Sequence, residues 1–290
     1  MSARALPWPA PGNRPPRRYG QLRDQVQAGT RFDIEGEGPA LVLLHGVGLD
    51  LSQWDAMVSL LRDEFTLVRY DLWGHGGSSK PLSDLRLKDY VAQLADLASY
   101  LKLERFALAG FSMGALIAQA YAVESAGRLA GLCLISAVHR RSSAARAAVE
   151  ARLAQAERDG PRSIIEPALE RWLTPAFRRR HPEAVSALRQ RLERNDAKGF
   201  LTAYRVFAAA DQELAGRAAA ITCPALVMTG TLDSGSTPEM AKSLAEEMPS
   251  GELEILEGLA HLAPIEGAEV VAERLRRFLL GPCAGPSRQR

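Results

Sequence analysis

Six short runs of mainly apolar residues occur along the chain, each ended by a turn of polar or small residues. In most of them the apolar side chains follow one another directly instead of alternating with polar ones. Continuous apolar runs of this length are typical of strands buried on both faces of a sheet. The six predicted strands are Leu41–Leu44, Thr66–Tyr70, Phe106–Ala109, Leu132–Ile135, Ala225–Met228 and Leu253–Leu256.

Between these runs, apolar residues recur at steps of three and four, as they do on one face of a helix. Leu87–Leu101 and Val270–Leu280 both have this pattern. Alternating strands and helices predict an α/β fold with a mostly parallel central sheet flanked by helices. Ligands of such sheets bind beyond the carboxyl ends of the strands, so functional side chains are expected in the loops that follow the strands.

One long segment, residues 138–219, has helical patterns and no strand signal. Because it lies between two predicted strands, we predict a helical cap inserted into a core made of residues 30–137 and 220–280. Residues 1–29 are expected to form a flexible, Pro/Arg-rich N-terminal tail, and residues 281–290 a flexible C-terminal tail.

Composition excludes several classes of protein. Hydrophobic residues make up 47% of the 290 residues, which is enough for a sizeable core, and the net charge of +2 is low for a nucleic-acid-binding protein. No apolar run approaches the ~20 residues that span a bilayer, and the N-terminus lacks the apolar segment of a secretion signal. The three cysteines have no metal or redox spacing, so we expect no metal site, structural thiols and a cytoplasmic location.

The strongest chemical signal is the pentapeptide Gly110-Phe111-Ser112-Met113-Gly114. It directly follows a predicted strand and opens a helical pattern, which is the context of the nucleophile elbow G-x-S-x-G. The glycines remove side chains that would clash in so tight a turn. Ser112 is therefore the predicted nucleophile.

A serine hydroxyl needs a base to take its proton. Of the five histidines, His261 is the best candidate, because it lies on a loop between the last predicted strand and the last predicted helix. That loop should reach the same edge of the sheet as Ser112. The other four are His45 and His75 in glycine-rich turns, and His139 and His181 in or near the insertion.

The base in turn needs a carboxylate that fixes its tautomer and stabilises the imidazolium. Asp233 follows the strand Ala225–Met228, and the chain order Ser112, Asp233, His261 is that of the α/β-hydrolase fold. Asp71 and Glu257 are the alternative acids. Asp71 fits a structural turn better, and Glu257 lies close to its strand.

An oxyanion hole needs two N–H donors aimed at the charge that develops on the substrate oxygen. The residue after the nucleophile, Met113, should supply one backbone N–H. The glycine-rich loop His45-Gly46-Val47-Gly48 follows the first predicted strand, and Val47 is the natural second donor. The alternative is a glycine-rich turn without a catalytic role.

Substrate contacts are harder to assign. Trp73 and Trp172 are candidates for substrate binding, with packing as the alternative for each. Residues 138–219 hold 15 Arg and one Lys against ten Asp and Glu. Most of that charge fits a solvated helix surface, and the sharper hypothesis is that a few arginines face the site and favour an anionic substrate.

On these residues the chain resembles the α/β-hydrolase superfamily from about Thr30 to Leu280, and within it most resembles the 3-oxoadipate enol-lactonases and related carboxylesterases. The resemblance rests on the His45–Gly48 loop, the Asp71–Ser79 segment, the elbow, the acid and base after the last strands, and the stretch Arg171–Phe177. It implies a triad of Ser112, Asp233 and His261, an oxyanion hole at Val47 and Met113, and a helical cap at 138–219.

Three segments depart from the enol-lactonase pattern: the oxyanion loop, the loop around Asp233, and Trp73, where the lactonases usually have Arg. These departures weaken the lactone assignment and leave the three catalytic residues in place. The reading is a cofactor-independent serine hydrolase that cleaves a carboxylic ester or lactone through an acyl-enzyme. The alternatives are a C–C hydrolase, an acyltransferase or perhydrolase on the same fold, and a non-catalytic ligand receptor.

Overall fold

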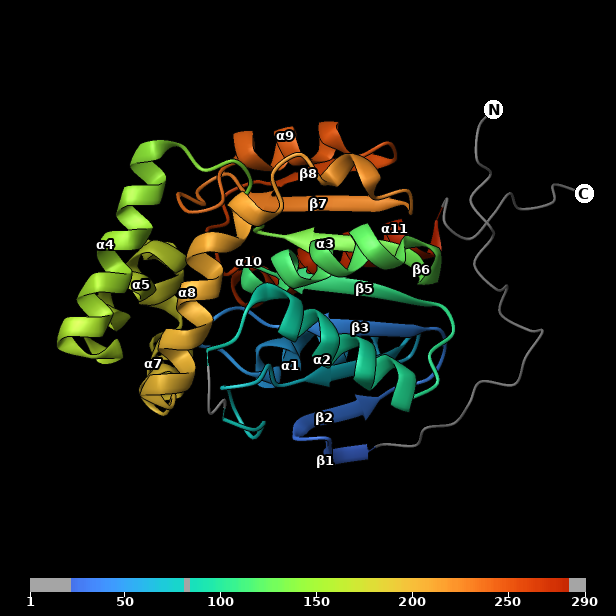
Figure 1. Cartoon of the computed structure of the whole chain (residues 1–290), viewed down its shortest axis with the longest axis horizontal. Helices are drawn as coiled ribbons and strands as arrows, with labels where there is room; N and C mark the ends of the chain where they lie inside the picture. Colours follow the sequence, from blue (N-terminus) through green and yellow to red (C-terminus); the bar gives the residue numbers. More distant parts are fainter. Residues whose placement is uncertain (1–21, 81–83, 282–290) are drawn as a thin grey trace, which may run out of the picture.

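The computed structural model describes residues 22–80 and 84–281. They form one eight-stranded sheet in the order β1-β2-β4-β3-β5-β6-β7-β8 (Figure 1). Strand β2 pairs antiparallel with β1 and β4, and the other pairs are parallel, so the sheet is mostly parallel as predicted. The strands are β1 Leu22–Gln27, β2 Thr30–Glu35, β3 Ala40–Leu44, β4 Thr66–Tyr70, β5 Phe106–Phe111, β6 Leu129–Ile135, β7 Ala225–Gly230 and β8 Gly251–Leu256.

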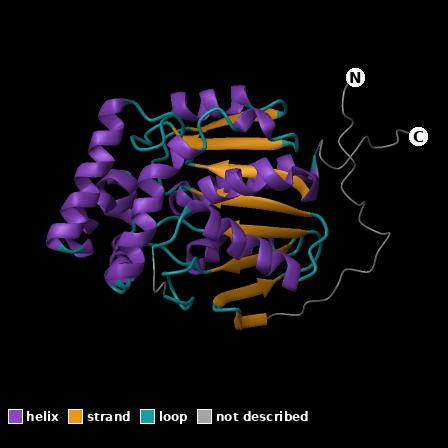
Figure 2. Cartoon of the chain, in the orientation of Figure 1, coloured by secondary structure: helices purple, strands orange, loops and turns teal. Residues whose placement is uncertain are grey.

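Helices cover both faces of this sheet (Figure 2). One face packs against α2 Leu87–Tyr100, α3 Met113–Ser125 and α9 Pro238–Glu247, and the other against α1 Asp55–Leu61 and α11 Ala268–Leu280. Side chains alternate between the two hydrophobic cores along a strand, since Val42 and Leu44 join the first and Leu41 and Leu43 the second. Burial on both faces explains why the strands have continuous apolar sequences.

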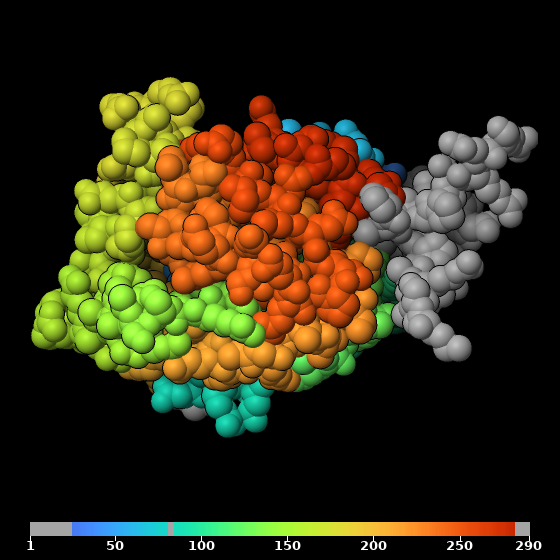
Figure 3. All heavy atoms as spheres, turned by 90° about the horizontal axis from the view of Figure 1, so that it is seen from above, coloured from blue at the N-terminus to red at the C-terminus, as the bar shows by residue number. Residues whose placement is uncertain are grey.

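Between β6 and β7 the chain forms a group of helices without a strand. This insertion lies beyond the carboxyl ends of the parallel strands, at one end of the molecule (Figure 1), and Figure 3 shows it from above in light green to golden orange. Its helices are α4 Ser143–Asp159, α5 Ile165–Trp172, α6 Pro175–Arg180, α7 Pro182–Glu193 and α8 Ala197–Glu213. The short helices of the chain are η1 Leu51–Trp54, η2 Ala126–Arg128, η3 Pro161–Ile164, η4 Ala218–Ala220 and α10 Ala263–Glu266.

Strand β1 corrects the sequence prediction, which assigned residues 1–29 to a flexible tail, and β2 was not among the six predicted strands. Leu22–Gln27 forms β1, which pairs with β2 through a turn at Ala28 and Gly29, both with positive φ. Such two-residue turns match the twist of a hairpin. The β1 sequence is largely polar, and its strand depends on backbone hydrogen bonds that apolar periodicity does not reveal. The rest of that tail and the C-terminal tail after residue 281 lie outside the described residues.

Within the described ranges, none of the helices combines the length and the apolar character required to cross a membrane.

Candidate active site

Ser112 occupies a sharp turn between β5 and α3. Its φ of 52° and ψ of −112° are strained for a residue with a Cβ, as expected for a nucleophile elbow. Gly114 makes the turn possible: a Cβ there would lie 2.5 Å from the backbone oxygen of Leu44 and 2.7 Å from that of His45. The turn places the Ser112 side chain at the N-terminus of α3, beyond the carboxyl edge of the sheet.

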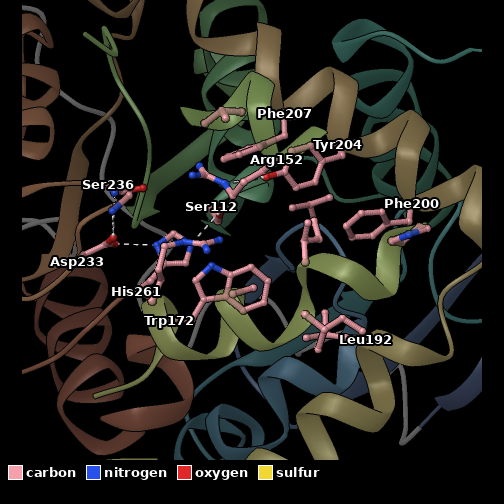
Figure 4. Close-up of a pocket in the computed structure, with 18 of the residues that line it drawn as sticks. Ser112, Arg152, Trp172, Leu192, Phe200, Tyr204, Phe207, Asp233, Ser236 and His261 are labelled. Carbon is pink, nitrogen blue, oxygen red and sulfur yellow. Dashed lines mark hydrogen bonds and ion pairs between the residues drawn. The ribbon is translucent and has the colours of Figure 1, made fainter. Parts of the chain in front are cut away.

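The three residues expected to act together do lie together (Figure 4). His261 Nε2 is 3.2 Å from Ser112 Oγ, and His261 Nδ1 is 2.8 Å from Asp233 Oδ2. An ionised carboxylate can only accept hydrogen bonds, so Nδ1 carries the proton and Nε2 is left to accept the Ser112 proton. The hydroxyl, imidazole and carboxylate therefore form one continuous hydrogen-bonded chain.

The Asp233 carboxylate is almost fully buried but well partnered. Its Oδ1 accepts backbone N–H bonds from Gly235 and Ser236, each at 2.9 Å, and its Oδ2 lies 3.2 Å from the Thr229 hydroxyl. Burial alone would raise the pKa of Asp233, but the adjacent His261 ring and these hydrogen bonds outweigh it and hold the pKa below its usual range. The carboxylate consequently stays ionised beside the imidazole.

The loop that carries His261 is held from two sides. The Ser136 hydroxyl, at the end of β6, donates to the His261 backbone oxygen at 3.0 Å. The next residue, Leu262, donates its N–H to the backbone oxygen of Trp172 at 2.9 Å, and the Trp172 and His261 rings are 6.1 Å apart. These contacts fix the imidazole between the sheet and the insertion.

The alternative acids do not face His261. Asp71 Oδ1 and Oδ2 accept the backbone N–H groups of Leu51 and Gly77, each at 2.7 Å, which is a structural role in a turn. Burial raises the pKa of Asp71, and the two N–H donors oppose that rise. Glu257 is exposed at the surface.

Two other histidines support the loop that follows β3. His45 Nε2 accepts the Leu72 N–H at 2.9 Å, and His75 Nε2 accepts the Gly48 N–H at 3.0 Å. Burial lowers the pKa of His45 to about 4 and the pKa of His75 to about 3. Both rings are therefore neutral near pH 7 and can serve as acceptors for backbone N–H groups.

The same loop positions Val47. The N–H groups on either side of it are occupied, since Gly46 donates to Gln53 Oε1 at 3.1 Å and Gly48 to His75. Among the described residues, the Val47 N–H has no protein acceptor, and Val47 lines the same pocket as Ser112. Met113 is the first residue of α3, where a backbone N–H has no partner within the helix.

A pocket opens between Ser112 and the insertion. Its walls are mainly apolar and aromatic, with Trp172 from α5, Leu192 from α7, and Phe200, Tyr204 and Phe207 from α8 (Figure 4). Trp172 therefore lies where the sequence prediction placed a substrate contact.

Trp73 does not lie at this site. It lines a separate depression with Gln27, Ala28 and Gln93, and its backbone N–H donates to Gln93 Oε1 at 3.1 Å. Its side chain packs against the core beside α2, so the sequence prediction that it binds substrate is not met. The packing alternative describes it instead.

Three arginines line the pocket, and sequence reasoning did not single them out. Arg141 is ion-paired with Asp211. Arg152 Nε donates to the Tyr204 hydroxyl oxygen at 3.3 Å, and Arg171 Nη1 donates to a backbone oxygen at 2.8 Å. No carboxylate of the described residues pairs with Arg152 or Arg171. Burial first, and repulsion from Arg152 second, lower the pKa of Arg171.

The part of the chain that the structure describes contains no candidate metal centre. No group of three or more His, Cys, Asp or Glu side chains within residues 22–80 and 84–281 could hold a metal ion.

Comparison with known proteins gives relatives along most of the chain. It is 33% identical over 247 residues to (E)-2-((N-methylformamido)methylene)succinate hydrolase of Acinetobacter baylyi, covering 84% of this chain and 92% of that protein. It is 28% identical over 232 residues to 3-oxoadipate enol-lactonase 2 of the same organism, covering 80% and 85%.

Solved structures agree with this result. The crystal structure of the enol-lactonase from Burkholderia xenovorans LB400 superposes with a TM-score of 0.80 at 29% identity, covering 86% of this chain and 96% of that one. A thermophilic esterase from Thermogutta terrifontis, with malate bound, gives a TM-score of 0.78 at 29% identity, covering 90% and 97%.

The family model described as "Alpha/beta hydrolase family" matches residues 41–274, which include the elbow serine, the acid loop and the histidine loop. The sequence reading of the fold and of the enol-lactonase resemblance is thereby confirmed, and the chain belongs to the alpha/beta hydrolase family.

Proposed function

We propose that this protein is a serine hydrolase that cleaves a carboxylic ester or lactone through an acyl-enzyme on Ser112. The observation that carries the proposal is the hydrogen-bonded chain from Ser112 through His261 to Asp233, at the inner end of a pocket. Relatives named as an enol-lactonase and as an esterase support this chemistry.

Each step then follows from the groups present. His261 Nε2 takes the Ser112 proton as Oγ attacks the substrate carbonyl carbon, and the imidazolium is stabilised by Asp233. The imidazolium next gives its proton to the leaving alkoxide oxygen. Water, deprotonated by the same Nε2, then attacks the acyl-enzyme carbonyl carbon. As the bond from that carbon to Oγ breaks, the imidazolium returns its proton to Ser112 Oγ, which releases the acid and restores the free hydroxyl.

The backbone N–H groups of Val47 and Met113 are proposed to bind the oxygen that becomes negative in each tetrahedral intermediate. The support is that both N–H groups are without a hydrogen-bond acceptor in the described structure, that Met113 directly follows Ser112, and that Val47 lines the same pocket as Ser112. Preorganised donors of this kind are worth roughly 3–4 kcal/mol each in the transition state. No step of the mechanism calls for a cofactor or a metal.

We further propose that the substrate is a small anion. Arg152 and Arg171 line the pocket without a carboxylate partner in the described structure, so an acid group of the substrate would satisfy both charges. The names of two relatives also denote derivatives of dicarboxylic acids, a substituted succinate and 3-oxoadipate.

The test combines labelling with a substrate panel. A fluorophosphonate probe should label the wild-type protein and fail to label Ser112→Ala, and that variant should lose hydrolysis of p-nitrophenyl esters while melting at the wild-type temperature. Esters and lactones with a carboxylate should be preferred over their methylated counterparts. Equal labelling or near-wild-type turnover in Ser112→Ala would refute the mechanism, and equal rates on both sets would refute the anionic substrate.

A further inference from the structure

Arg141 is a buried arginine, and one terminal nitrogen of its guanidinium has no hydrogen-bond partner in the described structure. It lies between β6 and α4, and its side chain is only 1% exposed. Its backbone N–H donates to Asp211 Oδ2 at 3.1 Å, and its Nη1 donates to Asp211 Oδ1 at 2.7 Å and to the backbone oxygens of Phe207 and Ala208. Its other terminal nitrogen, Nη2, has no hydrogen-bond partner in the described structure.

The charge around this guanidinium is not neutralised. Asp211 also lies 3.6 Å from Nη2 of Arg146, so a single carboxylate serves two arginines. Two guanidinium groups on one carboxylate leave an excess of one positive charge. A buried charge-bearing nitrogen without a partner is unfavourable, and an anionic oxygen is the ligand that satisfies it best.

Arg141 is one of the residues that surround the pocket of the nucleophile. Arg141 lines the cavity together with Ser112, and its guanidinium lies over the ring of Phe207, 4.5 Å from the ring centroid. The ring and Asp211 together hold the guanidinium in one orientation. Arg152 and Arg171 reach the cavity from α4 and α5, so Arg141 offers a separate position for a negative group.

We infer that Arg141 is a specificity-determining residue whose Nη2 binds a second acid group, so that the preferred substrates are esters or lactones with two carboxylates. The inference rests on the proposed function, because it treats the Ser112 pocket as the substrate pocket. Asp211 and Phe207 orient the guanidinium, and the substrate supplies the acceptor that the protein lacks.

The decisive variant is Arg141→Lys. Lysine keeps a positive charge near Asp211 and removes Nη2. The matched control is Arg146→Lys, which changes the second arginine on the same carboxylate but not a residue that lines the pocket. Binding is measured by calorimetry on proteins that also carry Ser112→Ala, so that the result does not depend on turnover. The probes are succinate, glutarate and adipate, each compared with its monomethyl ester.

In the Ser112→Ala protein that keeps Arg141, the best of the three diacids should bind at least about tenfold more tightly than its half ester, as expected for one charge-assisted contact. Arg141→Lys should lower that preference to less than about threefold, and Arg146→Lys should keep it. The inference is overturned if the diacid and its half ester bind equally without the Arg141 substitution, or if Arg141→Lys keeps the full preference.

Failure of the inference and failure of the proposed function are distinguishable. Fluorophosphonate labelling and turnover of an uncharged p-nitrophenyl ester by the wild-type protein report on Ser112, and both should be retained in Arg146→Lys with Ser112 intact, because Arg146 does not line the pocket. The preference for a diacid over its half ester reports on Arg141. If Arg141→Lys does not fold, as judged by its circular dichroism and melting curve, Phe207→Leu is measured in its place, because it removes the ring that orients the guanidinium. It should lower the preference for the diacid, and a fully kept preference would overturn the inference.

Discussion

The conversion of Asp233 to asparagine tests the proposed mechanism at one atom. Oδ1 of Asp233 accepts the N–H groups of Gly235 and Ser236, so an asparagine oxygen would take that place to keep both bonds. Its amide nitrogen would then face Nδ1 of His261, where Oδ2 now lies at 2.8 Å. An amide is a donor there, so Nδ1 would lose its proton and Nε2 would carry one instead.

A protonated Nε2 donates to the Ser112 hydroxyl and cannot accept its proton. The expected loss in kcat is about four orders of magnitude, the size of effect that the wrong tautomer causes in such triads, and it corresponds to ~5 kcal/mol in the activation barrier. The fold should be kept, because asparagine has nearly the shape of aspartate. The assay is kcat on a p-nitrophenyl ester, together with a thermal melt.

The matched control is Asp71→Asn, the same chemical change at the alternative acid. Asp71 bonds to the backbone of a turn and not to the imidazole, so this variant should melt at a lower temperature and keep kcat within about tenfold of wild type. The reasoning is refuted if Asp233→Asn retains kcat within about tenfold of wild type, or if Asp71→Asn is the variant that loses four orders of magnitude.

Three further predictions concern the rest of the fold and the pocket. Gly114→Ala should lower the melting temperature sharply, because its Cβ would lie 2.5 and 2.7 Å from two backbone oxygens. Gly127→Ala is the control and should leave the melting temperature unchanged, because a Cβ there meets nothing within 4 Å. Equal melting temperatures of the two variants would contradict the close packing of the elbow. Burial lowers the pKa of His45 to about 4, so as pH falls this histidine is protonated in the unfolded chain before it is protonated in the folded one. The contribution of His45 to the free energy of unfolding should therefore drop by about 2 kcal/mol from pH 7 to pH 5. Urea unfolding should show a smaller drop in His45→Gln, and an identical drop in both proteins would count against the buried neutral ring. Trp172→Ala should raise KM several-fold and Trp73→Ala should leave KM unchanged, since only Trp172 lines the pocket; the reverse result would mean that the pocket is assigned incorrectly.

The buried part of the fold was predictable because its strands are continuous apolar runs. All six expected strands are present, and the elbow was recognisable because the glycines and Ser112 directly follow one of them. The hairpin of β1 and β2 was missed because β1 is largely polar and depends on pairing between backbones. Periodicity reports which side chains are buried and does not report backbone partners.

The site was predictable where chemistry restricts the residue type, and not where packing decides. Serine, histidine and aspartate in loops after strands indicated Ser112, His261 and Asp233. Trp73 and Trp172 are the same residue type in equally suggestive segments, and only the three-dimensional packing separates them. The pocket arginines belong to an arginine-rich insertion, where a sequence cannot show which side chains point inward.

The insertion leaves the sheet after β6 and returns at β7, and these two strands are direct neighbours in the sheet. Because the two strands are parallel, the insertion begins at the carboxyl end of β6 and the chain then crosses back to the amino end of β7. The nucleophile and its partners lie in turns and loops that directly follow strands of the sheet. A different set of helices could replace this insertion between the same two strands without changing which strands pair in the sheet. The insertion supplies much of the pocket wall, so the wall can change while the hydrogen-bonded chain of Ser112, His261 and Asp233 is kept.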